Sequence, residues 1–271
     1  LAPALMSAGV LQINGLVGDL YASFLRDGSI AWLYYADRVQ QLPLALVGIA
    51  LSVALLPMIA RLLNEGKGDQ AKARLQDALM IAAALIFPAM MALVLIPDLV
   101  IETLFERGEF SSHDRMMTAS ALRIYALGLP AFVIVKCLAP VFYARHDTKT
   151  PMRLTIITVA VNALLALPLM QLYHHVGIAC AFVAAAWCNA ILHLVMILRC
   201  KMMPFFNGLG VWWFKLAAGL GVVVLIITCL QFWLSSLAAW LQLAFIIPSV
   251  LIGYGGFALI TGMIRPSQRS M

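Results

Sequence analysis

Long apolar runs recur along the chain, and they restrict its fold more than any other feature. A helix crosses the hydrocarbon core of a bilayer with about 20 mainly apolar residues. Eight such stretches occur, at approximately 1–25, 30–62, 72–97, 115–144, 151–172, 176–199, 211–234 and 240–263. They lack the period-2 alternation of membrane barrel strands. With 63% hydrophobic and 11% charged residues, the sequence predicts an all-α polytopic membrane protein of about eight transmembrane helices.

The distribution of Lys and Arg predicts the orientation of these spans. If the N-terminus is cytoplasmic, twelve of the 18 basic residues fall in cytoplasmic segments, and only Arg26, Arg107 and Arg115 fall outside. Basic residues favour cytoplasmic loops, so both ends of the chain are expected on the cytoplasmic side. The net charge of +6 then reflects membrane orientation and gives no reason to expect a nucleic acid partner.

The loops and cysteines carry no catalytic pattern. The outer loop at 97–115 has apolar residues at helical spacing and predicts a short interfacial helix. Its five carboxylates lack calcium-loop spacing and are expected to form a solvated acidic face. His174 and His175, in a short outer turn, are also expected to be solvated. The cysteines have no metal-ligand spacing, and no hydrolase, phosphate-loop or metalloprotease motif occurs.

Ionisable residues inside the spans are the candidates for function, because a charge in the bilayer is costly. Asp19, Asp37, Arg38 and Lys136 lie in spans, and Arg123 is a fifth case. In the second span, polar and small residues recur at steps of three and four, which places them on one helix face. These residues are Tyr34, Arg38, Gln41, Ala45, Gly48 and Ser52.

Arg38 heads this polar face. A guanidinium matches a phosphate in a two-point contact and stays charged at any working pH. We therefore expect Arg38 and Tyr34 to face a cavity that accepts an anionic head group. The alternative is a structural ion pair between Arg38 and Asp19 or another buried carboxylate. Lys136 is expected either to line the inner side of the cavity or to extend inward to the membrane surface.

The first span carries a polar stripe comparable to that of the second, whereas the last two spans are almost uncharged. Asp19 lies on a polar stripe of the first span and is a candidate ligand for a coupling cation, with Asn162 as a second oxygen ligand. Hydrogen bonding between helices is the alternative for both.

The last two spans contain one charged residue, Lys215, between residues 211 and 261. We expect them either to form a lipid-facing groove or to pack peripherally.

Four motifs carry a resemblance to a known family. They are WLYYADRVQQLP at 32–43, LFERGEF at 104–110, YALGLP at 125–130 and KCLAPVFYARHDTKTP at 136–151. The segment from residue 1 to about 199 resembles the MurJ/MviN lipid II flippases, in the MOP superfamily that includes the MATE exporters. The resemblance implies that the eight spans are the seventh to fourteenth of a fourteen-helix fold. Residues 1–200 would form the C-terminal lobe, and 201–271 two further helices with a lipid-tail groove. The N-terminal half of the same protein, absent from a chain that begins at Leu1 without Met, is then an expected partner.

The resemblance also implies a function. Such a flippase moves lipid II, an undecaprenyl-pyrophosphate-linked peptidoglycan precursor, across the bacterial cytoplasmic membrane by alternating access. No cofactor is expected, and Na⁺ or the membrane potential supplies the energy. Where the family often has a polar residue four positions after the asparagine of its sodium site, this chain has Ala166. The resemblance implies that Arg38 binds the pyrophosphate, and Asp19 and Asn162 are compatible with the family's sodium site. The residues expected from the spans themselves to line the surrounding cavity are Tyr34, Asp37, Gln41, Ser52 and Lys136.

Other functions remain open from the residues alone. A multidrug/cation antiporter of the same superfamily would use an acid such as Asp19, and a polysaccharide-lipid flippase would use Arg38. An intramembrane enzyme acting on polyprenyl phosphates should show clustered aspartates or a nucleophile near a leaflet surface, and none is found. A scaffold for cell-wall enzymes would not need a polar face headed by an arginine.

Overall fold

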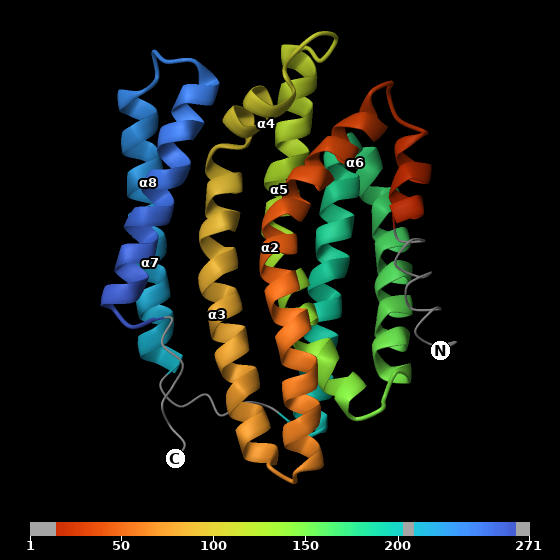
Figure 1. Cartoon of the computed structure of the whole chain (residues 1–271). Coiled ribbons are helices and arrows are strands. Elements are labelled where there is room, and N and C mark those ends of the chain that lie inside the picture. The colour runs from red at the N-terminus through yellow and green to blue at the C-terminus, as the bar shows by residue number, and fades with distance from the viewer. Residues whose placement is uncertain (1–14, 203–208, 264–271) are drawn as a thin grey trace.

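The computed structural model describes residues 15–202 and 209–263, with the backbone alone for residues 49–54 and 209. Residues 15–22 are helical, and the described parts contain no strand. Figure 1 shows the long helices side by side, with their axes roughly aligned. The predicted all-helical membrane fold is therefore confirmed. The helices are α2 (Ser29–Asn64), α3 (Gly68–Leu95), α4 (Pro97–Phe105), α5 (Ser112–Ala144), α6 (Lys149–Arg199), α7 (Leu209–Trp233) and α8 (Ala239–Ile260).

The predicted spans match these helices to within a few residues. Within the described parts, five helices are long and apolar enough to cross a membrane. One of them, α6, has 51 residues and covers two predicted spans. The early part of the first predicted span lies outside the described residues, and α4 is the short helix predicted in the outer loop. Following the predicted orientation, we call the end of the bundle that carries α4 the outer end and the opposite end the inner end.

The two halves of α6 run antiparallel and meet at His174 (Figure 1). His174 has φ 53° and ψ −132°, a backbone conformation that residues with a side chain rarely adopt. Beyond it, Gly177 lies directly against the first half. A Cβ atom at Gly177 would lie 2.0 Å from the carbonyl oxygen of Leu169. Glycine is therefore required for this close approach, which lets the chain reverse within a few residues.

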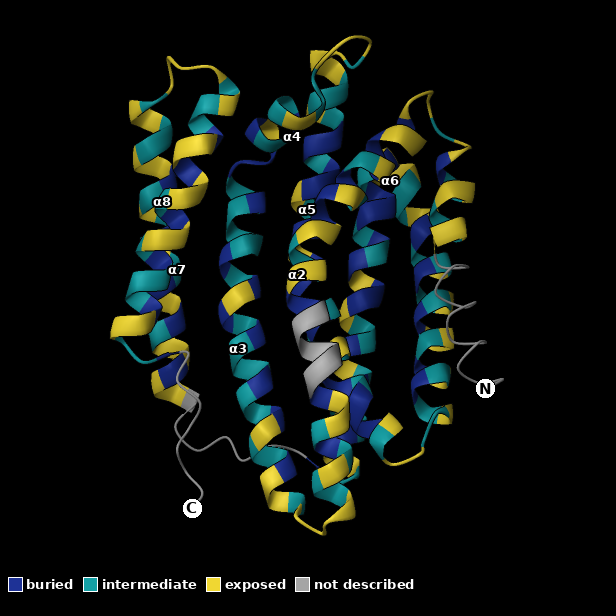
Figure 2. Ribbon diagram, in the orientation of Figure 1, coloured by how far each residue is buried: buried dark blue, intermediate teal, exposed yellow. Residues whose placement is uncertain are grey.

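Helix α5 lies at the centre of the bundle and contacts α2, α3, α4 and α6. The main apolar core joins α2, α3, α5 and α6 and includes Leu55, Leu75, Leu122 and Ile197. A second core joins α3 and α4 to α7 and α8. The last two helices thus pack as a pair against α3, and Figure 2 shows many exposed residues on their outward faces.

A proline in α3 is compensated by a tyrosine in α8. Pro88 has no backbone N–H, so the carbonyl of Ala84, four residues earlier, lacks its usual helical donor. The Tyr254 hydroxyl donates a hydrogen bond to the Ala84 carbonyl oxygen at 2.6 Å. A bare carbonyl in hydrocarbon is costly because no water reaches it. Tyr254 therefore links the α7 and α8 pair to the middle of α3.

The inner turn between α2 and α3 is strongly charged. Lys67 and Arg61 each place a nitrogen 2.8 Å from a Glu65 carboxylate oxygen. These hydrogen bonds, from Lys67 first and then Arg61, lower the pKa of Glu65 to about 2. Glu65 is consequently ionised throughout the physiological pH range.

Candidate functional site

Four side chains on α2 form a connected polar group. The Arg38 Cζ atom lies 4.7 Å from the centroid of the Tyr34 ring, within the range of a cation–π interaction. Arg38 Nη1 donates to Gln41 Oε1 at 3.3 Å, and Gln41 Nε2 donates to Asp37 Oδ2. Gln41 therefore connects Arg38 to Asp37, two neighbours in sequence that do not face each other on a helix.

The Arg38 guanidinium is exposed on this face, as are Tyr34 and Gln41. The ion pairs found among the described residues do not include Arg38. The alternative of a structural ion pair between Arg38 and Asp19 is thus not seen in the described part of the chain. Tyr34 and Gln41 hold the guanidinium in place and leave most of its N–H donors for a ligand.

Lys136 of α5 reaches the same face closer to the inner end. Its side chain is exposed and lies over Gly48, where a Cβ atom would come within 2.7 Å of the lysine Nζ. Gly48 follows Arg38 by ten residues, or about 15 Å along a helix. The structure therefore brings a second cation to the polar face of α2. The side chain of Ser52, predicted on this face, lies outside the described residues.

Asp19 and Asn162, the predicted cation ligands, lie on two neighbouring helices, the first helix and α6. Asp19 is exposed and lies within electrostatic range of Asp37. The Tyr21 hydroxyl donates to the carbonyl oxygen of Ala163 at 3.2 Å, which holds the first helix beside the buried Asn162. The described residues contain no group of three His, Cys, Asp or Glu suited to a metal ion. A cation here would therefore need amide or backbone oxygens as well.

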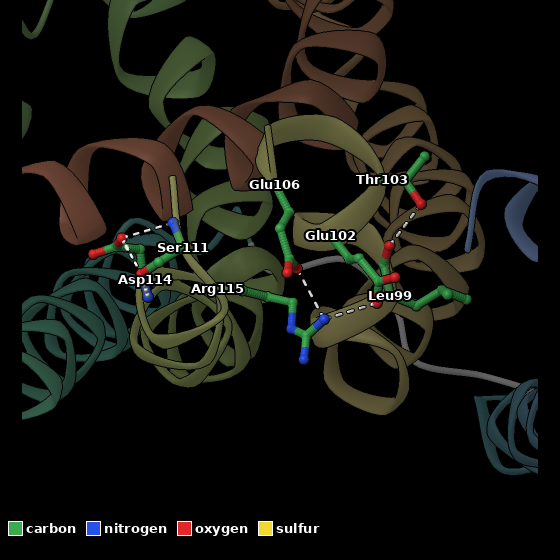
Figure 3. Close-up of polar contacts among 7 residues, drawn as sticks. All are labelled: Leu99, Glu102, Thr103, Glu106, Ser111, Asp114 and Arg115. Carbon is green, nitrogen blue, oxygen red and sulfur yellow. Dashed lines mark hydrogen bonds and ion pairs between the residues drawn. The ribbon is translucent and has the colours of Figure 1, made fainter. Parts of the chain in front are cut away.

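At the outer end, three carboxylates have specific partners. Arg115 Nη1 lies 2.8 Å from Glu106 Oε2 and 3.1 Å from Glu102 Oε2, which ties α4 to α5 (Figure 3). Asp114 forms a capping box with Ser111 at the start of α5. These carboxylates remain partly exposed, and each also has a polar partner that the prediction of a solvated acidic face did not include.

Trp32 joins the outer ends of α2, α5 and α6, a role that the sequence did not reveal. Its Nε1 donates to Asp114 Oδ1 at 2.8 Å, and its ring centroid lies 5.1 Å from that of His175. His175 is buried, and its Nε2 lies 3.0 Å from the Met117 carbonyl oxygen. The prediction that His175 is solvated is therefore wrong, because the kink at His174 turns it inward. His174 itself is exposed.

An apolar cavity of about 360 Å³ opens between α3, α5, α6 and α7. Its walls include Phe87, Pro130, Trp187 and Trp213. The Trp213 and Phe87 rings meet edge to face, with centroids 6.1 Å apart. Gln76, near the inner end of α3, is a polar member of a lining that is otherwise apolar. This lining suits an acyl or isoprenoid chain.

Residues 1–251 match the family model described as "Lipid II flippase MurJ". The chain belongs to the MurJ lipid II flippase family. A probable MurJ from Rhizobium tropici is 44% identical over 197 residues, which are 73% of this chain and 37% of that protein. A probable MurJ from Vibrio cholerae is 35% identical over 241 residues, or 89% of this chain and 45% of that protein. The chain thus spans less than half the length of these MurJ relatives.

Solved structures support the same fold. A MurJ in an inward closed conformation superposes with a TM-score of 0.80 at 25% identity, covering 96% of this chain and 52% of that one. A MOP superfamily transporter from Pyrococcus furiosus superposes with a TM-score of 0.64 at 15% identity, covering 97% of this chain and 62% of that one. The first match places the chain on the MurJ architecture, and the second shows that this fold is shared more widely.

Proposed function

We propose that this chain forms the C-terminal lobe of a lipid II flippase, in residues 1–200, with two further helices in residues 201–271. The flippase would move the undecaprenyl-pyrophosphate-linked precursor across the bacterial cytoplasmic membrane by alternating access, with both ends of this segment in the cytoplasm. The observation that carries the proposal is the exposed Arg38 guanidinium, held by Tyr34 and Gln41 without a carboxylate partner among the described residues.

The polar face of α2 suggests how the head group is handled. Arg38 would bind the pyrophosphate through two parallel N–H contacts. Lys136 offers a second cation over Gly48, about 15 Å further along the helix. A phosphate moving along this face would keep a positive partner at both depths, which offsets the cost of desolvating its charge. The other half of the cavity would come from the N-terminal half of a full-length flippase.

The isoprenoid tail would lie along the last two helices, apart from the head group. Their outward surface is almost wholly apolar, and the apolar cavity beside Trp213 would accept part of the chain. An undecaprenyl tail is far less costly to keep in such a site than in a polar cavity. Exposed members of this surface are Phe214, Leu225, Leu251 and Ile252.

A cation-coupled exporter is the second candidate, and the closeness of Asp19 to Asp37 favours it. Two carboxylates that repel each other are stabilised by a bound cation. In a flippase, the same pair would couple lipid transport to Na⁺. Replacement of Na⁺ by choline, or Asp19→Asn, should then slow transport of the lipid. If lipid transport is unaffected and a cationic drug is exported instead, the antiporter is the better description.

Complementation tests the assignment of Arg38. We expect a full-length flippase gene that contains this segment to restore growth to a bacterium depleted of its lipid II flippase. Arg38→Ala should abolish this rescue, and Arg38→Lys should restore it only weakly because a lysine makes no two-point contact. Arg61→Ala is a matched control, since Arg61 is an exposed arginine of the same helix paired with Glu65 at the inner end. Full growth with Arg38→Ala, at normal protein levels, would contradict the role of Arg38.

A further inference from the structure

Arg123 and Asp98 form a half-exposed ion pair at the outer end of the bundle. Arg123 Nη2 lies 3.5 Å from Asp98 Oδ2, and the side chains are 51% and 53% exposed. Arg123 Nε also donates to the carbonyl oxygen of Val94 at 3.2 Å, in the last turn of α3, and Asp98 lies in the first turn of α4. Both charges thus lie where α3 gives way to the short helix α4, a position that we expect at the level of lipid head groups.

This ion pair faces away from the polar face of α2. Asp114 of α5 accepts the hydrogen bond from Trp32 of α2, so that side of α5 faces α2. Arg123 follows Asp114 by nine residues, or about two and a half turns at 3.6 residues per turn, and therefore lies on the opposite side. Leu127, one turn further, is 42% exposed, and Pro130 below it lines the apolar cavity. The surface beneath Arg123 is thus apolar and partly exposed.

The ion pair itself leaves much of its binding capacity unused. A half-exposed pair at 3.5 Å contributes little to stability. The two contacts found for Arg123 occupy two of the five N–H donors of a guanidinium. A carboxylate likewise accepts several hydrogen bonds. A cation and an anion side by side, both open to the head-group layer, are complementary to a zwitterion.

We propose that Arg123 and Asp98 bind the head group of phosphatidylethanolamine from the outer leaflet. The phosphate would contact Arg123, the primary ammonium would donate to Asp98, and one acyl chain would run down α5 over Leu127. Phosphatidylglycerol would place an anion without an amine beside the Asp98 carboxylate. Phosphatidylcholine has a quaternary amine with no N–H to donate. This site lies on the opposite side of α5 from the proposed flipping cavity and does not depend on that function.

Native mass spectrometry of the purified protein in detergent tests the proposal. With equal amounts of phosphatidylethanolamine, phosphatidylglycerol and phosphatidylcholine, we expect the protein to retain phosphatidylethanolamine several-fold more than either other lipid. Arg123→Gln and Asp98→Asn should each remove this excess. Arg61→Gln serves as the control, because Arg61 is an exposed, ion-paired arginine at the inner end, and it should keep the excess.

Several results would overturn the site. They are equal retention of the three lipids, an excess that survives both substitutions, and a preference for phosphatidylglycerol that depends on Arg123 alone. Competition by undecaprenyl phosphate that needs Arg123 but not Asp98 would indicate an isoprenoid site instead. If Arg123→Gln fails to fold, the retention of phosphatidylethanolamine by Asp98→Asn alone tests the site. This experiment measures lipid retention and not flipping. A negative result would therefore contradict the lipid site without contradicting the flippase proposal.

Discussion

At Gly48, a single added methyl group should impair function while leaving folding intact. A Cβ there would meet the flexible end of Lys136 rather than backbone, so Gly48→Ala should displace the ammonium group while changing the unfolding free energy by no more than about 1 kcal/mol. If Lys136 serves the head group, rescue of a flippase-depleted cell should fall as far with Gly48→Ala as with Lys136→Ala. Gly221→Ala, a helix glycine with open space around it, is the control and should rescue fully.

At this scale, the sequence predicted which residues share a helix face but not their contacts with other helices. Arg38 and Gln41 follow a period of 3.6 within one helix, so their common face could be predicted. The contact of Lys136 with Gly48, and the closeness of Asp19 to Asp37, depend on how separate helices pack. The burial of His175 depends on one backbone conformation at His174, which no spacing in the sequence specifies.

The hydrogen bond from the Tyr254 hydroxyl to the Ala84 carbonyl oxygen makes the packing of α8 contribute to the stability of α3. Tyr254→Phe should leave the Ala84 carbonyl without a donor and cost about 1–3 kcal/mol. The expected result is a lower thermal unfolding midpoint in detergent, together with faster proteolysis of the α7 and α8 segment. Tyr173→Phe is the control, because Tyr173 is 59% exposed. An unchanged midpoint for Tyr254→Phe would show that another group satisfies the Ala84 carbonyl.

The helices themselves could be predicted from the sequence because hydrocarbon leaves the backbone few alternatives. Apolar runs of about 20 residues must satisfy their own backbone groups, and only a helix does so within one segment. The partners of the prolines could not be predicted in this way. Pro88 indicates that one carbonyl loses its donor, but the identity of the replacement, Tyr254, comes from a helix 166 positions along the chain.

The orientation of the whole molecule can be tested at two turn positions on opposite ends of the bundle. Asn64 lies at the inner end of α2, and Glu109 lies in the exposed turn between α4 and α5. With Cys229, an exposed native thiol, changed to serine, a membrane-impermeant maleimide should label Glu109→Cys in intact cells. It should label Asn64→Cys only after the membrane is opened. The reverse pattern would contradict the orientation predicted from the basic residues.

The central position of α5 also has a consequence for how this protein tolerates change. In the apolar stretch of α5, 61% of the residues are buried, against 22% in that of α7. A side chain packed against four other helices can be exchanged only for one of similar volume, whereas a side chain facing lipid needs only to be apolar. Substitutions drawn at random should therefore be rejected far more often in α5 than in α7. Over evolutionary time, α5 should keep its residue identities while α7 keeps little beyond its hydrophobicity.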